Sequence, residues 1–344
     1  MPDFESIPDQ KIPSHILNTL LRKGAIPHAL LFLGMEGVGK QAAAKRFAMA
    51  CNCLANSADM PYLPSDKDGV LHNLNNKIPC GVCVSCRKIL SKNHPDIIEI
   101  KPSGSFIKIA QIRDLREILA LKPYEAKIRV VIISDVQVMN AAAGNAILKV
   151  LEEPPEKTVL ILTATEQSDI IPTIASRCQF VRFNPVSQKR LAEMLVEEKG
   201  LPPDSAAILA AMANGSFSRA LDIVGIAGLR KRDWIINETE SLSLNETGKC
   251  LVFAEKLSKD KENFLEFLEI LKIWYRDIIV FKSHPEKIIF FDLLGKIQNA
   301  SNRHTKPDLL SRFDAIESCR QNVRANVNLR LTAETLLLRF AQNQ

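Results

Sequence analysis

A glycine-rich segment near the N-terminus has the composition of a phosphate-binding loop. Residues 34–41 are Gly-Met-Glu-Gly-Val-Gly-Lys-Gln, which matches G-x-x-x-x-G-K but has a glutamine where the pattern ends in serine or threonine. Glycines let backbone N–H groups converge on phosphate oxygens, and the lysine adds a positive charge beside the terminal phosphates. These features predict a nucleotide site formed by Gly34, Gly37, Gly39, Lys40 and Gln41.

Gln41 replaces the hydroxyl that would ligate Mg²⁺ in such a loop. A glutamine amide oxygen could reach a metal ion, but Mg²⁺ requires near-ideal octahedral coordination. We therefore expect either a loop that no longer binds nucleotide productively or one that retains weak binding. Efficient hydrolysis is not expected in either case.

A second polar position follows the apolar run at 130–133. An ATPase needs a carboxylate there to hold Mg²⁺ through water, and usually a second carboxylate to orient the attacking water. This sequence offers only Asp135, preceded by Ser134. If Ser134 takes the metal-holding position, Asp135 takes that of the base, and its side chain is one methylene shorter than a glutamate. If Asp135 holds the metal instead, no carboxylate follows it to act as the base. Since loss of a positioned base typically costs ~10²–10⁴-fold in rate, both registers argue against an ATP motor.

Three cysteines at intervals of three between positions 80 and 86 have the spacing of a structural zinc knuckle. A fourth ligand must come from elsewhere, and the candidates are Cys51, Cys53 and His72. A site made only of thiolates has no open coordination position, so its zinc would be structural. Free reduced thiols and an iron–sulfur cluster are the alternative interpretations.

The elements that must position these residues alternate between strand and helix over the first half of the chain. Apolar runs predict buried strands at 29–33, 97–100, 130–133 and 159–162. Amphipathic or alanine-rich segments predict helices near 16–21, 41–49, 109–119 and 141–151. This order predicts an α/β fold with a parallel sheet flanked by helices. After about residue 183 only helical patterns remain, which predicts a small helical domain and then a larger one.

Composition excludes several classes of protein. The 344 residues are 46% hydrophobic and 24% charged, values that are ordinary for a globular protein. No apolar run approaches the ~18 residues of a membrane span, and the N-terminal residues do not resemble a signal peptide, so we expect a cytoplasmic protein. Eight cysteines are too few for a disulfide scaffold. The net charge of +6 permits contact with nucleic acid, but 6% aromatic residues with no stacking platform argue against a nucleic-acid binder that acts alone.

Several motifs occur together in an order typical of one family. They are Pro27-His28-Ala29-Leu30-Leu31-Phe32 before the glycine-rich loop, the cysteine module, His94-Pro95-Asp96, the stretch from Asn145 to Pro155, and Ser176-Arg177-Cys178. In that order they resemble the bacterial clamp-loader subunits of DNA polymerase III, which are AAA+ proteins. The likeness continues at 326–331, where Leu329 replaces the usual proline. It implies an AAA+ P-loop core at 1–182 that carries a zinc module near 53–86, a helical lid at 183–227 and an all-α collar at 228–344.

The family contains two zinc-bearing kinds of subunit. The gamma/tau motor has intact nucleotide motifs, whereas the delta-prime kind carries degraded versions of them. Gln41 and Ser134 place the sequence with the second kind, and a gamma/tau-type motor is the alternative. The resemblance therefore implies a stator-like subunit whose own ATPase is absent or very weak. It also implies partners: gamma/tau and delta subunits, the sliding clamp and primer-template DNA.

The resemblance further implies roles for individual residues. Arg177 matches an arginine finger that one subunit extends into the ATP site of its neighbour, where it stabilises charge on the γ-phosphate. Thr165 matches a first sensor position. Ser218 stands where a phosphate-contacting arginine is expected in the second sensor motif, and Arg219 falls one residue later. The zinc ligands that the resemblance implies are Cys53, Cys80, Cys83 and Cys86.

Overall fold

The computed structural model describes residues 7–56, 79–104, 106–223, 226–242, 247–325 and 327–342. The chain divides into two compact units, which are described separately below. The first comprises Met1–Arg190 with Gly215–Ser218, and the second comprises Leu191–Asn214 with Arg219–Gln344.

The first unit is built on a five-stranded parallel sheet with the order β2-β3-β4-β1-β5. Its strands are β1 (Ala29–Leu33), β2 (Ile97–Ile100), β3 (Arg129–Ile133), β4 (Thr158–Ala164) and β5 (Gln179–Arg182). The first four confirm the predicted strands. β5 was not predicted, because its sequence Gln-Phe-Val-Arg forms no apolar run and only Val181 is buried.

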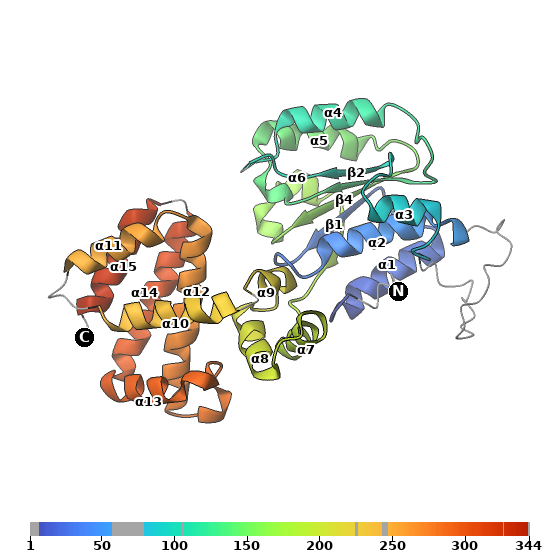
Figure 1. The fold of residues 1–344 in the computed structure, drawn as a ribbon. Coiled ribbons are helices and arrows are strands. Elements are labelled where there is room, and N and C mark those ends of the chain that lie inside the picture. The colour runs from blue at the N-terminus through green and yellow to red at the C-terminus, as the bar shows by residue number, and fades with distance from the viewer. Residues whose placement is uncertain are drawn as a thin grey trace, which may run out of the picture. The chain divides into compact units, whose positions relative to one another are not determined.

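Helices cover both faces of this sheet, as the alternating pattern predicts (Figure 1). On one face lie α1 (Lys11–Lys23) and α2 (Lys40–Asn52), with α3 (Val84–Leu90) beside α2. On the other face lie α4 (Ile109–Leu119), α5 (Ala141–Glu152) and the short α6 (Pro172–Ala175). The predicted α/β fold class is confirmed.

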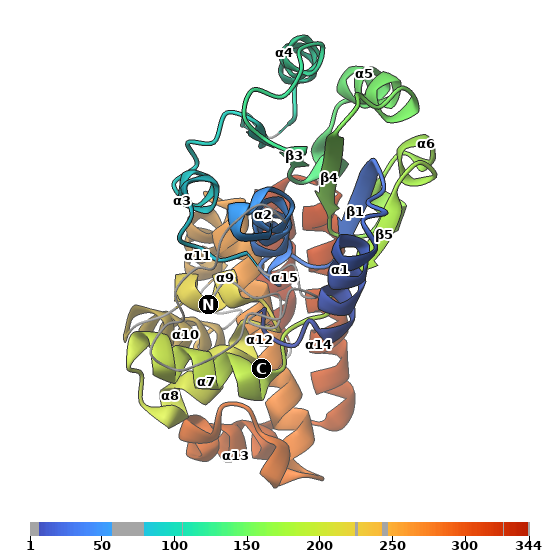
Figure 2. The ribbon, with the colours of Figure 1, turned by 90° about the vertical axis from the view of Figure 1, so that its right-hand side faces the viewer.

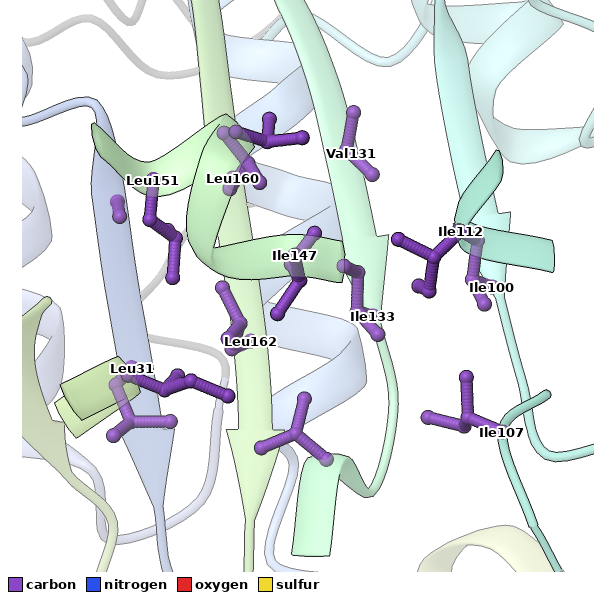
Figure 3. Packing of buried hydrophobic residues seen from close by; sticks show 14 of the residues in the cluster. Leu31, Ile100, Ile107, Ile112, Val131, Ile133, Ile147, Leu151, Leu160 and Leu162 are labelled. Carbon is purple, nitrogen blue, oxygen red and sulfur yellow. The ribbon is translucent and has the colours of Figure 1, made fainter. Parts of the chain in front are cut away.

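Alternate residues along the strands supply the two cores. Leu31, Val131 and Leu160 point to the face covered by α4 and α5, where they meet Ile112 and Ile147 (Figure 3). Their neighbours on each strand point to the opposite face, against α1 and α2. Full burial of one such side chain contributes about 1.5–3 kcal/mol to the free energy of folding. The two layers therefore stabilise the strands whose ends carry the polar residues.

The chain is helical beyond the sheet, which confirms the predicted C-terminal helical region. The helices are α7 (Gln188–Lys199), α8 (Pro203–Met212), α9 (Phe217–Ile223), α10 (Ile226–Glu240), α11 (Thr247–Leu257), α12 (Lys261–Phe281), α13 (Leu294–Arg303), α14 (Lys306–Arg324) and α15 (Leu329–Gln342). In the second unit α12 packs against α14 and α13, while α11 packs against α15 (Figure 2). Within the described residues, none of the helices combines the length and the apolar character that a membrane crossing requires.

Candidate functional site

The glycine-rich loop connects the end of β1 to the start of α2, as a phosphate-binding loop must. Gly34, Gly37 and Gly39 have φ angles of +148°, +77° and +99°, in a region that favours glycine. The N–H of Gly34 donates to the carbonyls of Ala164 and Thr165 at the end of β4, both at 3.2 Å. The loop therefore lies between a strand and a helix and uses the backbone freedom of its glycines, as the sequence motif predicts.

The lysine of this loop is bound by the loop itself. Lys40 is 7% exposed, and its ammonium group donates to the carbonyl oxygen of Gly34 and, at 2.9 Å, to that of Met35. Burial lowers the pKa of Lys40, although the negative charges of Asp135 and Glu36 oppose this effect. A phosphate would have to draw the ammonium group away from these two carbonyls.

The two residues that weaken the sequence motifs lie in contact. The Gln41 side-chain amide donates a hydrogen bond to the Ser134 hydroxyl at 3.1 Å. Strand order explains the contact, because β1 and β3 both pair with β4 and end at the same edge of the sheet. A Mg²⁺ ion bound directly by one of these residues would lie ~2.1 Å from that side chain. If the other residue bound the ion through a water molecule, both the ion and the water would lie between the two side chains. The direct contact does not fit such an ion.

Neighbouring strand ends add polar groups to the same edge. Asp135 has a φ angle of +57°, and its N–H donates to the Thr163 hydroxyl at 3.1 Å. The amide of Gln137 donates to the Thr165 hydroxyl at 3.4 Å. The predicted sensor residue Thr165 therefore lies at the sheet edge that carries Ser134.

The segment that resembles a second sensor lies directly on the glycine-rich loop. The N–H of Phe217 donates to the carbonyl of Gly37 at 3.0 Å. A Cβ atom on Gly37 would overlap the hydroxyl oxygens of Ser216 and Ser218. Ser218 thus approaches the loop without bringing a positive charge, while Arg219 belongs to the second unit.

Arg177 follows α6 and is held by partners outside the glycine-rich loop. Its Nη2 donates to Glu152 Oε1 at 2.9 Å, and its Nη1 donates to the Thr173 carbonyl at 3.0 Å and the Ser176 hydroxyl at 3.4 Å. The Arg177 side chain is 36% exposed. A guanidinium in this state is ordered but accessible.

Four cysteine sulfurs form a separate cluster beside α2 and α3. The Sγ atoms of Cys53, Cys80, Cys83 and Cys86 all lie within 4.8 Å of one another. Four thiolates at ~2.3 Å from a tetrahedral zinc are separated by ~3.8 Å, so a small contraction would accommodate the ion. Cys51 is not part of the cluster, and His72 lies outside the described residues.

The backbone around the cluster is already arranged for thiolates. N–H groups point at sulfur atoms, from Cys80 to Cys53 at 3.4 Å, from Cys83 to Cys80 at 3.4 Å, and from Cys86 to Cys83 at 3.5 Å. A hydrogen bond from the Cys86 thiol lowers the pKa of Cys53 to about 5, and the same contact raises the pKa of Cys86. Soft thiolate ligands in a closed set suit a structural zinc ion.

Some residues for which the sequence predicts no role lie in contact with the predicted site residues. Ile7 is 3% exposed and would lie 2.8 Å from a Cβ atom on Gly39. Glu152 contacts Arg177, and Gln137 contacts Thr165. Nothing in their spacing indicates these contacts, which depend on how the chain folds back.

Comparisons with known proteins bear on this arrangement. Residues 9–187 match a family described as DNA polymerase III, delta subunit, and residues 229–342 match its C-terminal part. The chain belongs to the family of DNA polymerase III delta subunits. The resemblance seen in the sequence is therefore confirmed.

Individual members of the DNA polymerase III families give the extent of the likeness. The chain is 28% identical to DNA polymerase III subunit delta' of Bacillus subtilis, over 94% of this chain and 93% of that protein. It is 30% identical to subunit tau of the same organism over 82% of this chain, but it spans only 51% of tau. A solved gamma-subunit-related protein from Thermotoga maritima is 20% identical, with a TM-score of 0.40, over 95% of this chain and 99% of that one.

Proposed function

We propose that this chain is the delta-prime, stator-like subunit of a bacterial clamp loader. In this role it supports ATP-driven loading of the sliding clamp onto primed DNA without hydrolysing ATP itself. The observation that carries the proposal is the hydrogen bond between Gln41 and Ser134. It joins the two side chains that stand where a motor would hold Mg²⁺, although the glycines keep the backbone conformations of a phosphate-binding loop.

The four-cysteine cluster supports a structural role for zinc. Cys53 and Cys86 are buried, and the four sulfurs would fill a tetrahedral coordination sphere. The ion would tie the end of α2 to α3, which are neighbours in the fold. In this proposal the metal stabilises the core and takes no part in chemistry.

Arg177 is proposed to act in the ATP site of the adjoining motor subunit. A guanidinium supplied in trans stabilises charge on the transferred phosphoryl group and can contribute 10³–10⁵-fold in rate. Its partial exposure is consistent with a side chain that reaches another subunit. Its contacts with Glu152 and Thr173, away from the chain's own glycine-rich loop, are consistent with action elsewhere.

The proposal assigns a role to each part of the chain. Residues 1–182 would form an AAA+ core, 183–227 a lid, and 228–344 a collar that packs with other subunits. The partners would be gamma/tau and delta subunits, the sliding clamp, and primer-template DNA reached through the assembled complex. Such a subunit would work at the replisome on the nucleoid.

The finger assignment is tested in the assembled clamp loader. Arg177→Ala should lower DNA- and clamp-stimulated ATP hydrolysis at least tenfold while leaving assembly intact. Arg182→Ala is the matched control, because Arg182 is an exposed arginine of the adjacent strand that binds the Gln167 side chain. Equal rates for wild type and Arg177→Ala would refute the assignment.

A gamma/tau-type motor is the second candidate. The glycine conformations of the loop and the identity to tau favour it. In that case the isolated chain would hydrolyse ATP, and Lys40→Ala would abolish the activity.

A further inference from the structure

The carboxylate of Glu152 links Arg177, which follows α6, to the end of α5. Glu152 is the last residue of α5, and its Oε1 accepts a hydrogen bond from Arg177 Nη2 at 2.9 Å. The Thr173 carbonyl, in α6, accepts from Nη1 at 3.0 Å. The guanidinium is thus held between α5 and α6, two helices that pack against each other.

These contacts leave part of the guanidinium available. Arginine carries five N–H donors in a planar fork, and the three recorded contacts of Arg177 use three of them. A phosphate oxygen could accept the other two while Glu152 stays in place. The carboxylate therefore orients Arg177 without competing for all of its donors.

We propose that Glu152 is a positioning residue for Arg177, an inference that rests on the finger role proposed above. A long arginine side chain loses rotamer freedom when it binds a phosphate, and an ion pair that already restricts it reduces that loss. Glu152 and Arg177 are 50% and 36% exposed, so the ion pair is partly screened by water. Its removal should cost about two- to five-fold in rate, far less than the loss of Arg177 itself.

The chain offers a matched control in the next residue. Glu153 is an exposed carboxylate at the same end of α5, and no ion pair is recorded for it among the described residues. Glu153→Ala therefore removes the same charge from the same region without touching Arg177.

The test measures steady-state ATP hydrolysis by the clamp loader assembled with gamma/tau-type and delta subunits. Glu152→Ala should lower kcat about two- to five-fold with an unchanged KM for ATP. Glu152→Gln keeps an oxygen that can accept from Nη2, so it should recover part of the loss. In an Arg177→Ala background, Glu152→Ala should have no further effect.

Any of four results would overturn the inference, and they separate it from the function on which it rests. If Glu152→Ala behaves like Glu153→Ala while Arg177→Ala is slow, the finger stands and the positioning role fails. If Glu152→Ala slows the Arg177→Ala complex further, or raises KM alone, Glu152 acts by another route. If Arg177→Ala itself changes nothing, the finger role fails and the inference fails with it.

Discussion

The side chains of Gln41 and Ser134 are joined by a 3.1 Å hydrogen bond although they are separated by 93 positions in the sequence. In the proposed stator role, each stands where a subunit that hydrolyses ATP would need a group to hold Mg²⁺. Gln41 is exposed and Ser134 is buried, so the bond links a surface side chain at the start of α2 to the end of β3.

The first prediction concerns this contact. Gln41→Ala should lower the free energy of unfolding by about 0.5–1.5 kcal/mol, the usual contribution of a single hydrogen bond. It should leave ATP hydrolysis by the assembled complex unchanged, because the bond has no part in chemistry. Urea denaturation and the ATPase rate check the two halves, and a loss of complex ATPase in a well-folded variant would contradict the account.

The second prediction concerns zinc. Cys83→Ser should lose the metal and lower the melting temperature, because the cluster would keep only three thiolates. Cys51→Ser is the matched control, since Cys51 is a partly buried cysteine near the same helix end that is not part of the cluster. Metal analysis should find about one zinc per chain in the wild type and in Cys51→Ser. Zinc retained by Cys83→Ser, or iron in place of zinc, would refute the assignment.

The third prediction concerns Asp96 of the His-Pro-Asp motif, which is 2% exposed. Its carboxylate accepts N–H groups from Tyr124, Glu125 and Ala126 at 2.8–2.9 Å and pairs with the buried Arg129 at 3.3 Å. Burial alone would raise the pKa of Asp96, but these donors together lower it below its usual value. Asp96→Asn should therefore lower the free energy of unfolding at pH 7 by about 2–4 kcal/mol.

The same contacts give this loss a defined pH dependence. The pKa of Asp96 is lower in the folded chain than the ~3.9 of an unfolded one, so the stabilisation is complete above about pH 5. It is lost as the pH falls through the folded-state pKa. The difference in unfolding free energy between wild type and Asp96→Asn should thus be constant from pH 7 to about pH 5 and shrink below about pH 4. A difference that does not change down to about pH 3 would contradict the assignment.

The fourth prediction concerns the serine contacts on the glycine-rich loop. Gly37→Ala must hold alanine at positive φ and also displace the Ser216 and Ser218 hydroxyls. Gly104→Ala is the control, because Gly104 has a similar φ of +73° but open space around its Cβ position. Both should lose about 1 kcal/mol to backbone strain, and Gly37→Ala should lose a further 1–3 kcal/mol from the overlap. Equal melting temperatures for the two variants would show that the serines do not lie against the loop.

Much of the first unit could be predicted from the sequence. Continuous apolar runs such as Val130 to Ile133 identify strands buried on both faces, and the intervening periodic segments identify helices. β5 could not be predicted in this way, because it buries only Val181 and contains no continuous apolar run. The other edge strand, β2, can be predicted from the sequence because three of its four residues are isoleucine.

The candidate site was less accessible to prediction. From the sequence, Gln41 and Ser134 are separate departures from ATPase motifs, and Arg177 matches an arginine-finger position. It could not show that the first two bind each other, because their contact depends on strand order. The pairing of Arg177 with Glu152 likewise depends on the packing of α6 against α5.

The most direct test of the central claim is steady-state ATP hydrolysis by the purified chain at saturating Mg²⁺, with Lys40→Ala measured alongside. The account predicts no turnover above background for the wild type, and therefore no difference between the two proteins. A measurable turnover that Lys40→Ala abolishes would contradict it and identify the chain as a motor.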